Sequence, residues 1–191
     1  MRLFVAIELS DAVRAAVADL QVRLTAAGSG AELRWAEPAN LHLTVKFLGD
    51  LPDALLPEVE AACAEVAAGS PFFDFAVRGA GAFPKRGGPL KTLWAGLDRS
   101  GAEAWTTLVR RAEPLFLPFG VAREGGLAPH VTLCRVKSAT PEQDETLRAA
   151  LAAEAQTDCG AQTATRLALI QSTLDPRGAV YTPLSHFNLT G

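Results

Sequence analysis

The amino-acid sequence predicts an α+β fold with antiparallel strands and helices outside them. Strand-like and helix-like segments follow one another without the regular alternation that a doubly wound parallel sheet requires. Two segments of the same form, each a strand followed about eleven residues on by a helix, begin near His42 and His130, nearly half of the 191-residue chain apart. We therefore predict one domain over residues 1–191, with two related lobes whose two antiparallel sheets line a central cleft.

Each element has a local signal. "RLFVAIEL" alternates as a strand does, and Ser10 and Asp11 cap a helix that ends at Gly28. "ELRW" is a short strand and "LHLTVKFLG" a longer one, with a turn between them at residues 38–40. The same reasoning predicts helices at about 53–68, 102–116 and 141–155. It also predicts strands at "FFDFAVRGAGAF", "LKTLWAGL" and "HVTLCRV", and a C-terminal hairpin through the turn "DPRG".

Composition narrows the function classes. About half of the residues are apolar and the formal net charge is −3, which argues against a protein that coats long nucleic acid, although a local phosphate pocket stays open. The three cysteines have no C-x-x-C spacing, which predicts free thiols rather than a disulfide framework or a zinc site. No stretch reaches membrane-spanning length, so we expect no membrane contact, and free thiols favour the cytoplasm. The sequence does not specify an oligomeric state, and a monomer is the default expectation.

Two of the three histidines stand in the same setting, as "LHLT" and "PHVT". Side chains alternate along a strand, so His42, Thr44 and Lys46 are expected on one face and the apolar residues between them, with Phe47, on the other. The same rule pairs His130 with Thr132. Facing strands of this kind would place two imidazoles and two hydroxyls around one cavity.

Two imidazoles can divide acid–base work near neutral pH, and threonine hydroxyls can donate to the non-bridging oxygens of a phosphate. That set suits in-line attack on a phosphodiester without a metal. Lys46 could add positive charge on the His42 face, or it could lie at a solvated strand end. The three tryptophans are expected in the core, the loop "FPKRGGPLK" in solvent, and His186 in a structural position.

The paired motifs resemble the 2H phosphoesterase superfamily. With "RLFVAIEL", "LRWAEPANLHLTVKFLGDL", "LWAGL", "PHVTLCRVK" and "YTPLSHFNL", the chain is most similar to the RNA 2′,3′-cyclic phosphodiesterases, also called 2′-5′ RNA ligases. The resemblance implies metal- and cofactor-free hydrolysis of a terminal 2′,3′-cyclic phosphate on RNA to a 2′-phosphomonoester, with 2′-5′ RNA ligase activity as an accompaniment.

The resemblance also implies residue roles. It makes His42 the proton donor and His130 the proton acceptor, although the symmetry of the motifs cannot choose between them. It places a phosphate-holding arginine at Arg135, whose guanidinium can fork two phosphate oxygens. Strict alternation puts Arg135 on the face opposite His130, so that role requires the strand to end or bulge near Cys134.

Three other functions stay open. The expected partners are RNA ends with a 2′,3′-cyclic phosphate, which include those of tRNA fragments. In the first alternative, the same chemistry acts on a small cyclic nucleotide instead. The chain could also be an RNA-end or tRNA binding module in which catalysis is incidental. A metal-dependent hydrolase is the third alternative, and activity in a chelator would exclude it.

Overall fold

The computed structural model describes residues 1–85, 87–123, 128–175 and 178–190. Its α-helices are α1 (Asp11–Ala27), α2 (Leu56–Ala68), α3 (Arg99–Phe116) and α4 (Pro141–Ala153). Its strands are β1 (Arg2–Glu8), β2 (Glu32–Trp35), β3 (His42–Asp50), β4 (Phe73–Phe83), β5 (Thr92–Leu97), β6 (Val131–Ser138), β7 (Asp158–Ala164), β8 (Arg166–Asp175) and β9 (Gly178–Asn188).

The strands form one antiparallel sheet in the order β7-β4-β5-β6-β3-β1-β8-β9, with β2 added to β6. β3 and β6 meet through a single residue pair, Leu43 with Val131, whereas β1 and β3 pair along seven positions. The sheet is therefore continuous but narrow at its middle. The two expected sheets are its two halves, and the expected α+β class with antiparallel strands is confirmed.

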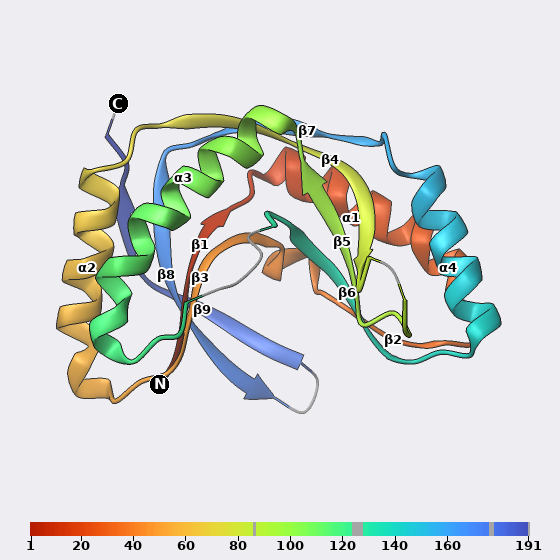
Figure 1. Ribbon diagram of the computed structural model, residues 1–191, viewed down its shortest axis with the longest axis horizontal. Helices are drawn as coiled ribbons and strands as arrows, with labels where there is room; N and C mark the ends of the chain where they lie inside the picture. Colours follow the sequence, from red (N-terminus) through yellow and green to blue (C-terminus); the bar gives the residue numbers. More distant parts are fainter. Residues whose placement is uncertain (86, 124–127, 176–177, 191) are drawn as a thin grey trace.

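The helices lie on the outside of the arched sheet (Figure 1). α2 and α3 contact each other; α2 covers β8 and β9, whereas α3 contacts β3 of the same half and β4 of the other half. α1 and α4 contact each other and cover β7 and β4 of the other half. Each motif strand thus leads into a helix that packs on its own half, β3 into α2 and β6 into α4.

The main core fills the space between the sheet and these helices. Leu43, Val131 and Leu133 from the motif strands are fully buried in it. A smaller cluster lies apart, formed by Phe4, Ala6, Ala168 and Ile170 on the other face of β1 and β8. Alternate residues of β1 therefore support both faces of the sheet.

Each motif strand carries a β-bulge just after its threonine. Along β3, Thr44 pairs with Ala6 and Lys46 with Val5, so Val45 is the extra residue. Along β6, Thr132 pairs with Trp94 and Cys134 with Leu93, so Leu133 is the extra residue. The residue after each bulge switches to the core face, and the next one returns to the face of the histidine.

Two expected face assignments on β3 are wrong because of its bulge. Lys46 turns to the core side and is 1% exposed, rather than sharing the face of His42. Phe47 turns outward and is 51% exposed, and its ring lies 6.0 Å from that of Phe4, which also contacts His42. Strict alternation could not anticipate either position, because the bulge adds one residue to the count.

Most predicted elements are present with shifted ends. Ser10 caps α1 by accepting from the Val13 amide, as expected. The second helix begins with a 3₁₀ turn at Asp53–Leu55, and α3 begins three residues earlier than predicted, after Asp98. The short edge strand β7 was not predicted, because "DCGAQTA" has few β-branched residues and depends on pairing with β4.

Some expectations fall outside the described residues: Arg86, most of the loop "REGGLAP", and the centre of the turn "DPRG". The three cysteines are buried free thiols, as expected. In the described part of the chain, no helix is long and apolar enough to cross a membrane.

The narrow middle of the sheet gives a first prediction. Leu43→Ala removes a fully buried side chain at the junction of the two halves and should lower the free energy of unfolding by about 2–5 kcal/mol in urea titration. Val22→Ala is the control, because Val22 is 70% exposed, and it should change stability by less than about 0.5 kcal/mol. A similar small effect for Leu43→Ala would show that the junction is not a packed contact.

Candidate active site

The pair Leu43–Val131 brings the two motifs together on one face of the sheet. Because the strands run antiparallel there, the register that joins Leu43 to Val131 sets His42 opposite Thr132 and Thr44 opposite His130. The four polar side chains lie on the face away from the buried Leu43 and Val131, and all four are half-buried. Imidazoles and hydroxyls therefore occupy alternate corners of one small square.

Hydrogen bonds hold the His42 ring on both sides. Its Nδ1 lies 2.7 Å from the carbonyl oxygen of Asn40, and its Nε2 lies 3.0 Å from Oγ1 of Thr44. A carbonyl oxygen only accepts, so Nδ1 carries a proton. In the neutral ring Nε2 is consequently the bare nitrogen, and it accepts from the Thr44 hydroxyl.

His130 is held in the same way. Its Nδ1 lies 2.8 Å from the carbonyl oxygen of Ala128, again two residues before the histidine. The Nδ1 proton is fixed by the same argument, which makes Nε2 the nitrogen able to exchange a proton with a ligand. The two motifs thus share backbone geometry as well as sequence.

Aromatic side chains support both imidazoles. The Phe4 ring lies 4.8 Å from His42, and the Tyr181 ring stands edge-on to His42 at 5.4 Å. Phe83 stands edge-on to His130 at 5.2 Å and packs on Trp94, which is the cross-strand neighbour of Thr132. These contacts restrict the rotation of both rings and shield one side of each from water.

The pKa of His42 is lowered from its ordinary value, chiefly because burial disfavours the charged ring. The hydrogen bond to the Asn40 carbonyl opposes this shift, and the charge of His130 lowers the pKa further. The two imidazoles are therefore close enough for the charge of His130 to act on His42. Without a ligand, the geometry favours a neutral His42.

Arg135 lies on the site face. Strict alternation would place Arg135 on the opposite face. The bulge at Leu133 adds one residue and so returns Arg135 to the face of Thr132. Its side chain is exposed, and Nη1 donates to the hydroxyl of Thr92 on the neighbouring strand at 3.0 Å. One edge of the guanidinium is thus positioned by the protein, and the group stands on the face that carries the histidines.

Lys46 is not brought together with the other predicted site residues. Its ammonium donates to the carbonyl oxygen of Ala122 at 2.8 Å and lies 3.7 Å from Oε1 of Glu113. These contacts tie β3 to α3 and to the segment that precedes the second motif. A lysine is tolerated in the core at this position because a carbonyl oxygen and a carboxylate both contact and stabilise its charge.

Sequence reasoning missed several residues that shape the site. Asn40, Phe4, Phe83 and Tyr181 come from four different elements, and only the folded chain brings them to the histidines. Asn40 had a weak signal, because it stands two residues before His42. Among the tryptophans, Trp105 is buried as expected, and its indole N–H donates to the carbonyl of Thr44 at 2.9 Å.

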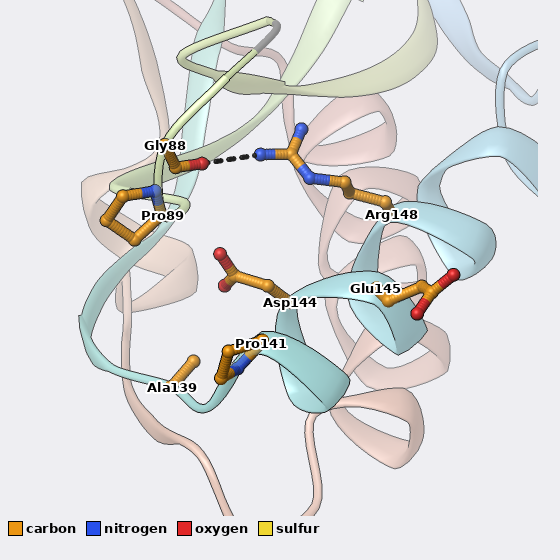
Figure 2. Close-up of a pocket in the computed structure, with 7 residues that line it drawn as sticks. All are labelled: Gly88, Pro89, Ala139, Pro141, Asp144, Glu145 and Arg148. Atoms are coloured by element: carbon orange, nitrogen blue, oxygen red, sulfur yellow. Dashed lines mark hydrogen bonds between the residues drawn. The ribbon is translucent and has the colours of Figure 1, made fainter.

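A separate pocket of about 380 Å³ lies between the β4–β5 connection and α4 (Figure 2). Asp144 lies in this pocket with one carboxylate oxygen bonded to the Leu90 amide, and Arg148 donates to the carbonyl of Gly88 across it. No residue of either H-x-T motif lines this pocket. The histidines stand instead on the open face at the middle of the sheet.

His186, the third histidine, lies outside the square. It is on β9, and its Nε2 is 2.9 Å from Oε2 of Glu8, which also pairs with Arg166. It therefore sits in a surface network of charged groups, in agreement with the structural position expected for it.

The chain is similar to known proteins in sequence and in fold. Residues 7–94 match the family model described as LigT like Phosphoesterase. A curated protein of Methanothermobacter thermautotrophicus, named RNA 2′,3′-cyclic phosphodiesterase, is 30% identical over 191 residues, which cover 99% of each chain.

Solved structures share the fold. A crystal structure from Thermus thermophilus matches with a TM-score of 0.80 and 28% identity, covering 100% of this chain and 99% of the other. Escherichia coli LigT complexed with 3′-AMP matches with a TM-score of 0.76 and 21% identity, covering 100% and 98%.

The lowered pKa of His42 predicts a pH-dependent stability. Above the ordinary histidine pKa of about 6.5, the ring is neutral in both folded and unfolded chains. Below it the unfolded chain binds a proton that the folded His42 resists, so the folded state loses stability as the pH falls through this window. Between about pH 7.5 and about pH 5.5, the wild type should therefore lose more free energy of unfolding in urea titration than His42→Gln loses.

The comparison between the two proteins cancels the titration of the groups that do not interact with His42. An equal loss of stability in wild type and variant over this pH range would mean that burial does not depress the His42 pKa.

Proposed function

Since the chain belongs to the LigT-like phosphoesterase family, we propose that it is an RNA 2′,3′-cyclic phosphodiesterase that opens a terminal cyclic phosphate to a 2′-phosphomonoester. One observation carries the proposal: the two H-x-T motifs face each other across the pair Leu43–Val131. In each motif Nδ1 of the imidazole is bonded to a backbone carbonyl, which leaves Nε2 to exchange a proton with a ligand. Relatives that span nearly the whole chain carry this enzyme name, which supports RNA ends as the substrate.

The proposed reaction needs two proton transfers, one from the attacking water to a histidine and one from the other histidine to the leaving 3′ oxygen. Nε2 of His130 removes a proton from water as the water oxygen attacks phosphorus in line with the 3′ oxygen. The bond from phosphorus to the 3′ oxygen breaks, and Nε2–H of His42 protonates that oxygen. The phosphate stays on the 2′ oxygen. Thr44 and Thr132 donate hydroxyl protons to the non-bridging oxygens, and Arg135 forks the same phosphate.

The donor role of His42 depends on the bound phosphate. In the unliganded protein, burial lowers the pKa of His42 and favours a neutral ring, which could not donate. A phosphate anion between the rings would oppose this shift, because an opposite charge nearby favours the protonated imidazole. We therefore propose that His42 acquires its proton with the substrate, while His130 acts as acceptor.

The same geometry would permit 2′-5′ ligation. If a 5′-hydroxyl of RNA replaced water as nucleophile, the same bond to the 3′ oxygen would break and a 2′-5′ linkage would form. A small cyclic nucleotide could also enter, because the square contacts only the cyclic phosphate. An RNA-end or tRNA binding module is less well supported, since binding alone does not require two oriented imidazoles.

The proposal is tested with a short RNA ending in a 2′,3′-cyclic phosphate, incubated in a chelator. The wild type should convert it to the 2′-phosphate, because the mechanism uses no metal. His42→Ala and His130→Ala should each lower the rate by about 10²- to 10⁴-fold, the usual contribution of general acid–base catalysis. Products are separated as 2′- and 3′-phosphates.

His186→Ala is the matched control, since it removes a histidine from the surface of β9 and should retain activity. A wild type that is inert both with and without the chelator would refute the proposed activity. Turnover that persists in both motif variants would refute the two-histidine mechanism, and loss of activity in chelator would favour a metal-dependent hydrolase.

The order of the two roles gives a further prediction. In NMR titrations of the histidine rings, the pKa of His42 should rise when a non-hydrolysable analogue of the 2′,3′-cyclic phosphate is bound, because the phosphate stabilises the imidazolium. Thr44→Val serves as a control for the local environment, and there the ring should still respond to phosphate. If His42 stays neutral in the analogue complex while His130 carries the proton, the donor and acceptor roles are reversed.

A further inference from the structure

Arg34 stands beside Arg135 on the face that carries the histidines. It lies on β2 and is the direct cross-strand partner of Arg135 on β6, which in turn pairs with Thr92 on β5. Cross-strand partners share a face of the sheet, so the bulge that restores Arg135 to the site face places Arg34 there too. The side chains of both arginines are exposed.

This arrangement is unfavourable unless an anion accompanies it. Like charges directly opposite each other on paired strands destabilise a sheet. Among the described residues, neither Arg34 nor Arg135 makes an ion pair with a carboxylate. The chain as a whole has more acidic than basic residues, 21 against 18, so the pair does not reflect a general excess of positive charge.

Arg34 also faces the opposite half of the sheet. Its Nη2 lies 3.7 Å from the point that a Cβ on Gly178 would occupy, at the start of β9. The side chain of Asn40 holds the same strand by donating to the carbonyl of Ala179 at 2.9 Å. Tyr181, two residues on, stands against His42. Arg34 thus lies beside the start of β9, the strand whose Tyr181 contacts His42, and outside the square of the two motifs.

We propose that Arg34 binds the next phosphate of the RNA chain, the phosphodiester that joins the terminal nucleotide to the one before it. The inference rests on the proposed function and defines its substrate class. Arg135 holds the reacting phosphate, and Arg34, one strand farther out, forks the neighbouring one. The enzyme then prefers an oligonucleotide end to a nucleoside 2′,3′-cyclic phosphate, which lacks that second phosphate.

The test compares two substrates, a dinucleotide ending in a 2′,3′-cyclic phosphate and the corresponding nucleoside 2′,3′-cyclic phosphate. Arg34→Gln should lower kcat/KM for the dinucleotide by about 10- to 100-fold, through KM, as expected for a lost charge-assisted hydrogen bond. It should leave kcat/KM for the nucleoside substrate unchanged. The dependence of log KM on log salt for the dinucleotide should weaken by about 0.7, the value for one single-strand phosphate contact.

Arg110→Gln is the matched control, because it removes the same charge from an exposed site on the helix α3. It should leave both substrates unaffected. Arg34→Gln should also fold with a Tm at or above that of the wild type, since it relieves the opposition to Arg135.

A structural role would give a different result. Asp175 pairs with Gly178 in the β8–β9 hairpin, and an ion pair from Arg34 to Asp175 would stabilise that hairpin. Arg34→Gln and Asp175→Asn would then both lower Tm and impair both substrates, which would overturn the inference. Equal effects on the two substrates, or none on the dinucleotide, would overturn it as well. A wild type inert on both substrates would instead refute the proposed function.

Discussion

The contact between Leu43 and Val131 is the constraint on which the site depends. It is the one residue pair between β3 and β6 in the described part of the chain, and it joins the two halves of the sheet, which α3 also bridges by contacting both β3 and β4. Because antiparallel register is set by a single pair, this contact alone decides that each histidine faces the threonine of the other motif. A slip by one residue would turn the imidazoles toward the core. The burial of both side chains excludes that slip, since polar rings would replace them there.

The two bulges explain how the halves can share a backbone plan and still differ chemically. In each strand the sequence His-x-Thr is followed by a buried pair and then by a residue that returns to the site face. On β6 that residue is Arg135, and on β3 it is Phe47. The buried partner differs too, with Cys134 in one strand and Lys46 in the other. One half therefore presents a cation beside its motif and the other an aromatic ring, which suits a ligand with unlike ends.

The sequence was informative where local pattern and final structure agree. Alternation identified the motif strands and the faces of His42, Thr44, His130 and Thr132, because these residues precede the bulges. Alternation failed after Val45, because this extra residue of the bulge exchanges the faces of the residues that follow it and places Lys46 in the core. The contact of Tyr181 with His42 and the opposition of Arg34 to Arg135 depend on which strands become neighbours, and no local pattern specifies that.

The central claim is that two facing imidazoles act as one acid–base couple on a single phosphate. The pH dependence of kcat/KM for hydrolysis of a 2′,3′-cyclic phosphate end tests it most directly. The account predicts a bell-shaped profile for the wild type, with one limb from the ring that must be neutral and one from the ring that must be charged. In His42→Ala and His130→Ala, the residual activity should each time lose one limb and keep the other. A wild-type profile with a single limb, or variants that keep the complete bell, would contradict the account.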